Sequence, residues 1–219
     1  MPQLIPIPFL VVTVTLLVRA EFKHQQQRVY YFKPISTLLV IAIALLSFLT
    51  PTAKPSFTLW ITVGLILSLG GDVALMFKSN RAFLTGLVLF LLAHVVYTIS
   101  FTVPNGFHFP DLVTGGVLLV LGAAIYSYLL PGLGSMKRPV ILYILIICLM
   151  VNRAISTFFG DFFTRTQALL LTFGATLFWL SDLVLAINRF RHPLEANRLG
   201  LFLYYGGQLL IALSPSYFL

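Results

Sequence analysis

Two aspartates lie inside long apolar stretches of this 219-residue chain. An ionisable side chain inside a bilayer costs at least about 2.5 kcal/mol on insertion scales, and it is a functional candidate by default. The remaining acids fall in loops or at the ends of apolar stretches: Glu21, Asp111, Asp161 and Glu195. We therefore take Asp72 and Asp182 as the candidate catalytic residues.

Two carboxyl groups in a site of low dielectric constant favour one particular chemistry. Desolvation and mutual repulsion keep at least one of them protonated while the other is ionised. This arrangement performs general acid/base catalysis on acid-labile ethers and acetals. It needs no metal and no organic cofactor, and we expect neither. The chain has no HExxH zinc motif, no Gly-x-Ser-x-Gly elbow, no P-loop and no dinucleotide fingerprint.

Other polar residues inside the apolar stretches are candidates for binding the substrate. Ser68 precedes Asp72 by one helical turn, so we expect it to hydrogen-bond the carboxyl group. Tyr204 and Gln208 are four residues apart and share a helix face. Any of these side chains could instead hold helices together, which leaves a structural interpretation open. The candidate binding residues are Lys33, Ser68, His94, Tyr97, Asn152, Arg153, Tyr204 and Gln208.

The composition excludes a water-soluble protein. Apolar residues make up 59% of the chain, charged residues only 9%, and the mean hydropathy is +0.99, whereas soluble domains carry about 25% charged residues. The net charge of +8 would suit nucleic acid only if the basic residues formed one exposed face. They occupy the short gaps between apolar stretches instead, so we expect a membrane as partner and no nucleic acid.

The apolar stretches predict an all-α polytopic membrane protein with eight spanning helices in one transmembrane domain. A helix needs about 20 residues to cross the hydrocarbon layer, and the alternating polarity of barrel strands is absent. The predicted spans cover residues 4–20, 33–50, 57–77, 82–103, 111–130, 139–159, 167–188 and 198–218.

The basic residues predict the orientation through the positive-inside rule. Eleven Lys and Arg fall in one set of loops and three in the opposite set, which places both termini on the non-cytosolic side. Asp72 precedes the last apolar residue of its span by five positions, and so does Asp182. At about 1.5 Å per residue, both carboxyls lie roughly 8 Å beneath the cytosolic helix ends.

A weak internal repeat relates the two halves of the chain. Lys33-Pro34 matches Arg138-Pro139, and the Asp72-Val73-Ala74-Leu75 segment matches Asp182-Leu183-Val184-Leu185. Four spans separate the members of each pair, so the halves would run parallel, unlike the inverted halves of many transporters. Two interpretations stay open: a duplication into two four-helix halves, or chance matches between Leu-rich helices.

Several short motifs, taken in order, resemble the YhhN family of multi-pass, lysoplasmalogenase-like membrane proteins. The resemblance covers nearly the whole chain and rests on Phe32-Lys33-Pro34, Ser68 to Asp72, His94 to Tyr97, Tyr143 to Ala154, Ser181 to Ala186, and Tyr204 to Ile211.

The resemblance implies hydrolysis of the vinyl ether bond of a lysoplasmalogen, a single-chain glycerophospholipid, giving a fatty aldehyde and glycerophosphocholine or glycerophosphoethanolamine. The two acidic motif positions of the family fall on Asp72 and Asp182. Lys33 would attract the phosphate. Two alternatives from other classes remain, a proton-coupled transporter using the same aspartates and a structural or regulatory membrane protein. The role of each aspartate, the headgroup and the oligomeric state stay open.

Overall fold

The computed structural model describes residues 2–194, 198 and 200–218, and every regular element in them is helical. Glu195, which we expected in a loop, lies outside the described residues. Short 3₁₀ helices occur at Pro2–Leu4, Ser47–Leu49, Leu130–Gly132, Gly134–Met136 and Ser214–Tyr217. The α-helices are α1 (Ile7–Phe22), α2 (Gln26–Leu46), α3 (Pro55–Leu75), α4 (Asn80–Thr102), α5 (Pro110–Leu129), α6 (Lys137–Ser156), α7 (Arg165–Phe190) and α8 (Gly200–Leu213).

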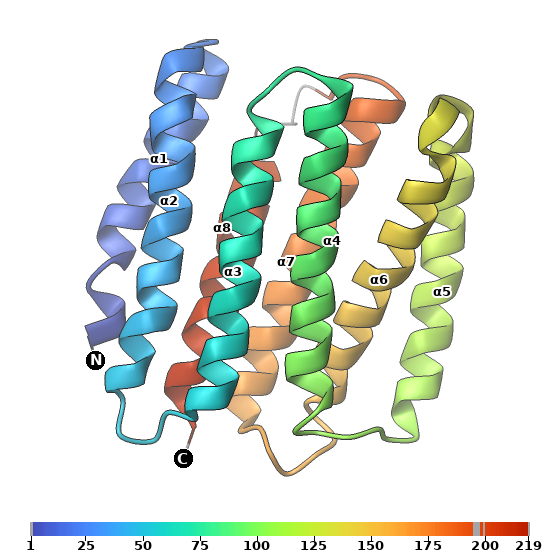
Figure 1. Ribbon diagram of the computed structural model, residues 1–219. Helices are drawn as coiled ribbons and strands as arrows, with labels where there is room; N and C mark the ends of the chain where they lie inside the picture. The colour runs from blue at the N-terminus through green and yellow to red at the C-terminus, as the bar shows by residue number, and fades with distance from the viewer. Residues whose placement is uncertain (1, 195–197, 199, 219) are drawn as a thin grey trace.

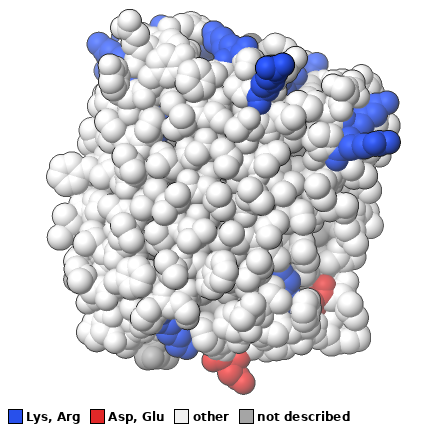
Figure 2. Space-filling model, viewed as in Figure 1, with Lys and Arg blue, Asp and Glu red and all other residues white. Residues whose placement is uncertain are grey.

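The helices form a polytopic membrane bundle, as predicted. Seven helical segments among the described residues are long and apolar enough to cross a bilayer. The eighth helix, α8, is shorter, and the 3₁₀ helix Ser214–Tyr217 continues it along the bundle. Large apolar side chains such as Val120 and Leu112 are about 70% exposed, and the broad middle of the face in Figure 2 carries little charge. Lipid is the solvent that suits this surface.

Successive helices alternate in direction, so the connections gather at two ends of the bundle (Figure 1). The α1–α2, α3–α4, α5–α6 and α7–α8 connections lie at one end, together with the eleven basic residues of the predicted cytosolic set. Both chain termini lie at the opposite end. Figure 2 shows Lys and Arg concentrated at the first end of the visible face.

The start of the second helix differs from the prediction. We expected Pro34 to open that span, but α2 begins at Gln26 and Pro34 lies inside it. Hydropathy detects only the residues that lipid surrounds, so it did not detect the polar first turns of α2 that precede Lys33. Proline inside a helix removes one backbone hydrogen bond, a loss that membrane helices tolerate when neighbouring groups compensate. Pro139 lies in the first turn of α6, where its missing N–H has no intrahelical partner anyway.

The two halves of the bundle pack in corresponding ways. Helix α1 packs on α2 as α5 packs on α6, and α3 packs on α4 as α7 packs on α8. Between the halves, α4 contacts α6 and α8 contacts α2. Gly174 and Gly207 let α7 and α8 approach closely, because a Cβ at either position would lie within 3 Å of the carbonyl oxygen of the other. This correspondence favours the duplication over chance matches.

Candidate functional site

Both predicted aspartates line one chamber of about 410 Å³ at the end of the bundle where the basic loops gather. Asp72 reaches it from the last turn of α3, three residues before the helix ends, and Asp182 from α7, eight residues before that helix ends. Both acids thus line one chamber, although neither lies five residues from its helix end as we predicted. The other polar residues that line it are Glu21, Lys33, Ser181, Asn188, Arg189, Arg198 and Tyr204.

The carboxyl group of Asp72 is held by a cation and two hydroxyl groups. Nζ of Lys33 lies 3.3 Å from Oδ1. Oδ2 accepts hydrogen bonds from Thr37 Oγ1 at 2.6 Å and from the hydroxyl of Tyr204 at 2.7 Å. Asp72 is only 1% exposed, and a buried carboxylate requires a paired charge and hydrogen bonds of this kind. The arrangement fits an ionised Asp72.

Helix packing around Lys33 explains why this ion pair forms. Lys33 and Thr37 are one turn apart on α2, so they share a face. The hydroxyl of Tyr205 on α8 donates to the backbone carbonyl of Lys33 at 2.9 Å, which is the carbonyl that the Thr37 hydroxyl also contacts at 3.2 Å. The α2–α8 contact between the two halves thus fixes both donors against Asp72.

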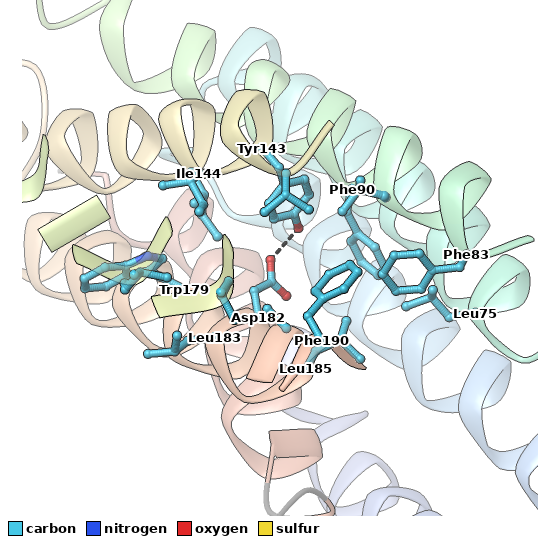
Figure 3. Close-up of a pocket in the computed structure, with 16 residues that line it drawn as sticks. Leu75, Phe83, Phe90, Tyr143, Ile144, Trp179, Asp182, Leu183, Leu185 and Phe190 are labelled. Atoms are coloured by element: carbon cyan, nitrogen blue, oxygen red, sulfur yellow. Dashed lines mark hydrogen bonds between the residues drawn. The ribbon is translucent and has the colours of Figure 1, made fainter. Parts of the chain in front are cut away.

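Asp182 has a different set of neighbours. Its Oδ2 accepts a hydrogen bond from the hydroxyl of Tyr143 on α6, which Figure 3 shows among apolar side chains. His94 Nε2 lies 3.9 Å from the same oxygen, and neither ring nitrogen of His94 has a hydrogen-bond partner among the described residues. Within that part of the chain, no Lys or Arg lies within 4 Å of Asp182. Because an uncompensated charge is costly at this depth, the surroundings fit a neutral carboxylic acid.

The predicted repeat accounts for the similar placement of the two acids, whose surroundings differ. Tyr204 on α8 contacts Asp72, and the residue 110 positions earlier, His94 on α4, approaches Asp182, which is itself 110 positions after Asp72. The remaining partners come from α2 for Asp72 and from α6 for Asp182. Equivalent helices therefore supply both sites, but only the first half provides a cation.

Tyr97 and Gln208 lie behind the chamber. The hydroxyl of Tyr97 donates to Oε1 of Gln208 at 3.1 Å, and Nε2 of Gln208 donates to the Tyr204 hydroxyl at 3.3 Å. Tyr204 in turn donates to Asp72. Tyr97 and Gln208 are almost completely buried and do not line the chamber. They position Tyr204, so their predicted direct contact with a substrate is wrong.

Ser68 does not bond Asp72, contrary to the prediction. Its hydroxyl donates to the backbone carbonyl of Gly64 at 3.0 Å. Serine inside a helix commonly bonds the carbonyl four residues earlier, and that bond satisfies its donor. The carboxyl group of Asp72 is meanwhile satisfied by donors from α2 and α8.

Asn152 and Arg153 belong to a second polar cluster at the opposite end of the bundle, so their predicted place in the site is wrong. Arg153 is 1% exposed, and its Nη1 lies 2.5 Å from Oδ2 of Asp111. It also donates to the carbonyl of Gly106. Asn152 donates to the backbone carbonyl of Asp111 at 3.0 Å. These bonds tie the α4–α5 connection to α6, which is a structural role.

Several residues of the site were not predicted from the sequence. Thr37 follows Lys33 by one helical turn, so the spacing could have placed it on the same helix face as Lys33. Tyr143 lies inside a motif of the resemblance but carried no predicted role. Glu21, Asn188, Arg189 and Arg198 lie at helix ends and loops on the predicted cytosolic side, and only the folded chain brings them to the chamber.

Comparison with known protein families assigns most of the described chain. Residues 29–215 match the family described as the YhhN family. This range includes both aspartates and all their partners. The chain belongs to the YhhN family. This confirms the resemblance inferred from the motifs.

Curated relatives of this YhhN family chain carry an enzyme name. The chain is 34% identical over 158 residues to lysoplasmalogenase TMEM86A of Bos taurus, and the match covers 70% of this chain and 64% of the relative. It is 35% identical over 165 residues to lysoplasmalogenase TMEM86A of Homo sapiens, covering 74% and 67%. A lysoplasmalogenase homolog of Dictyostelium discoideum is 26% identical over 204 residues, covering 77% and 66%. The chain thus spans about two thirds of the length of these relatives. No solved structure matches it significantly.

Proposed function

We propose that this chain hydrolyses the vinyl ether bond of lysoplasmalogens. The observation that carries the proposal is that two carboxyl groups with unlike surroundings open into one chamber near a membrane surface. One is paired with a cation, and the other has none among the described residues. The names of the curated relatives support the same reaction.

Asp182 is the general acid in this proposal. Hydrolysis of a vinyl ether begins with slow protonation of the β-carbon, which needs a neutral acid held against an apolar substrate. The Tyr143 hydroxyl occupies Oδ2 of Asp182 and leaves Oδ1 to carry the proton. Proton transfer forms the new C–H bond and leaves an oxocarbenium ion beside two carboxylates, which stabilise its positive charge.

Asp72 is the general base. It removes a proton from the water molecule that attacks the α-carbon, giving a neutral hemiacetal and a protonated Asp72. The hemiacetal hydroxyl then returns a proton to Asp182, the bond between the α-carbon and the glycerol oxygen breaks, and Asp72 protonates that oxygen. The products are a fatty aldehyde and a glycerophospho-alcohol, and both aspartates regain their starting states. Lys33 and Tyr204 hold the carboxylate of Asp72 throughout.

The headgroup has candidate partners at the mouth of the chamber. Lys33 pairs with Asp72, so it is a weaker candidate for the phosphate than the sequence indicated. The guanidinium groups of Arg189 and Arg198 line the same chamber, and arginine binds phosphate through paired donors. Glu21, also in the lining, is the acid available for an ammonium group.

We also infer that the chamber faces the cytosol. The end of the bundle that carries it holds eleven of the fourteen Lys and Arg residues. Positive charge in short loops favours the cytosolic side. Both termini then lie on the non-cytosolic side.

The test is aldehyde release from a lysoplasmenyl lipid by the purified full chain in lipid nanodiscs. Asp72→Asn and Asp182→Asn should each lower the rate at least about 100-fold, because positioned acid/base groups contribute about 10² to 10⁴. Asp161→Asn is the matched control, since Asp161 is exposed at the opposite end. Unchanged rates in both variants, or no aldehyde from the native chain, would overturn the proposal. Uncoupler-sensitive flux in proteoliposomes with no chemical product would support the transporter instead.

A further inference from the structure

A second, apolar pocket opens beside Asp182. It is narrow, with a volume of about 60 Å³, and it lies between α4, α5, α6 and α7. Asp182 is the one acidic residue among the described residues that line it, and Figure 3 shows the carboxyl group surrounded by apolar and aromatic side chains. The residues found in this pocket and not in the polar chamber include Leu87, Ile125, Ile144, Ile147, Trp179 and Leu183.

The apolar pocket and the polar chamber meet at Asp182. Five residues line both cavities, and Asp182 is the only polar one among them. A molecule that filled both cavities would have a polar part on one side of this carboxyl group and an apolar part on the other. The junction between the two parts would lie at Asp182.

The pocket runs along the helices beside the chamber, and on α7 Asp182 lies three residues from its deep end. On α7 its lining extends from Phe190 to Trp179, about 16 Å along the helix axis. On α6 it extends from Val140 to Ile147, away from the same end. A hydrocarbon chain in the pocket would therefore lie along the helix axes and pass Asp182.

We propose that this pocket receives the hydrocarbon chain of a single-chain lipid and selects for its length. A chain held in this pocket would have its vinyl ether carbons beside Asp182. The effect on catalysis therefore rests on the proposed function. A chain in the bilayer is already in an apolar solvent, so the pocket gains little affinity from the hydrophobic effect. Its contribution is orientation, which determines how often the double bond meets the acid.

The first experiment measures kcat/KM for lysoplasmenyl lipids with chains of 10 to 18 carbons, a range of probe lengths on the order of the pocket's axial extent. Ile147→Trp should narrow the deep end and lower kcat/KM at least about tenfold for the longest chains while sparing the shortest. Trp179→Leu should move the optimum toward longer chains. Leu149→Trp is the control, because Leu149 lies on the same helix and is 42% exposed on the outer surface. An unchanged chain-length profile in both pocket variants of an active enzyme would overturn the proposal.

The second experiment does not depend on hydrolysis. The chain has two tryptophans, Trp179 in the pocket and Trp60, which is 43% exposed on α3. In the Trp60→Phe variant, a lysolipid with a brominated, saturated ether chain should quench Trp179 fluorescence saturably, and unbrominated lysolipid should compete. In Trp179→Phe, quenching of Trp60 should rise in proportion to the lipid fraction without competition. Quenching of Trp179 that rises in proportion to the lipid fraction, with no competition from unbrominated lysolipid, would overturn the proposed chain-binding pocket even if aldehyde release is observed.

The two experiments separate the proposals. Saturable quenching of Trp179 without aldehyde release would support the pocket and reject the hydrolase. Aldehyde release that both pocket variants leave independent of chain length would support the hydrolase and reject the pocket.

Discussion

Lys33 and the buried Asp72 form an ion pair between α2 and α3, with Nζ of Lys33 3.3 Å from Oδ1 of Asp72. The corresponding acid of the second half, Asp182, has a tyrosine hydroxyl as its closest partner and no lysine or arginine within 4 Å among the described residues. The difference between the two sites fits our proposal of a carboxylate at Asp72 and a neutral acid at Asp182. It also allows the roles of the two aspartates to be tested separately.

Replacing Lys33 alone should destabilise the protein more than replacing Lys33 and Asp72 together. Lys33→Met leaves a buried carboxylate without a counter-ion, and breaking such a pair costs about 3–5 kcal/mol. The double variant Lys33→Met/Asp72→Asn removes the charge as well and should recover most of that loss in a thermal unfolding measurement. It should remain inactive. Losses of stability that simply add in the double variant would show that the two groups are not coupled.

Tyr143→Phe should lower kcat about fivefold and leave KM unchanged. The hydroxyl of Tyr143 orients Asp182, and one such hydrogen bond contributes about 1 kcal/mol. An effect confined to kcat indicates an interaction that matters in the transition state. Tyr126→Phe is the matched control, since the Tyr126 hydroxyl makes only a long, exposed contact of 3.4 Å with the carbonyl of Lys137. A rise in KM with unchanged kcat would contradict a positioning role.

Arg153→Met should lower stability without affecting turnover. It breaks the buried pair with Asp111 at the end of the bundle opposite the chamber, at a cost of about 3–5 kcal/mol. Thermal unfolding should reveal the loss, while kcat/KM per folded molecule stays at the native value. The exposed Arg165→Met provides the comparison. A folded Arg153→Met protein with a large loss of kcat would show that Arg153 does act in the active site.

Gly64→Ala and Gly116→Ala should have opposite effects on stability. A Cβ at Gly64 would overlap the ring of Tyr97, which packs against α3 at that point. The strain should cost about 1–3 kcal/mol. A Cβ at Gly116 meets nothing within 4 Å, so alanine there should stabilise α5 by up to about 1 kcal/mol. Equal melting temperatures for the two variants would contradict this helix packing.

Cysteine labelling in cells should reveal which end of the bundle faces the cytosol. In a Cys148→Ala background, which removes the single native cysteine, Lys23→Cys should be protected from a membrane-impermeant maleimide added outside. Asp161→Cys should react, because Asp161 is exposed at the opposite end. The reverse pattern would place the chamber on the outer side.

The amino-acid sequence alone determined the class of the protein and identified its two central acids. Stretches of about 20 apolar residues can be stable only in lipid, so the helices and their alternation follow from length and hydropathy. Counting residues from the ends of two spans then located Asp72 and Asp182 at one level, and both line the chamber.

The tertiary structure decided which side chains meet. A membrane helix is apolar both toward lipid and toward its neighbours, so the sequence pattern carries little information about its rotation. Ser68 therefore fitted the site by spacing alone but bonds its own helix, and Arg153 pairs with Asp111 instead. Packing of α2 on α3 brings Thr37 to Asp72, and packing of α6 on α7 brings Tyr143 to Asp182. Those contacts give two similar aspartates different electrostatic surroundings.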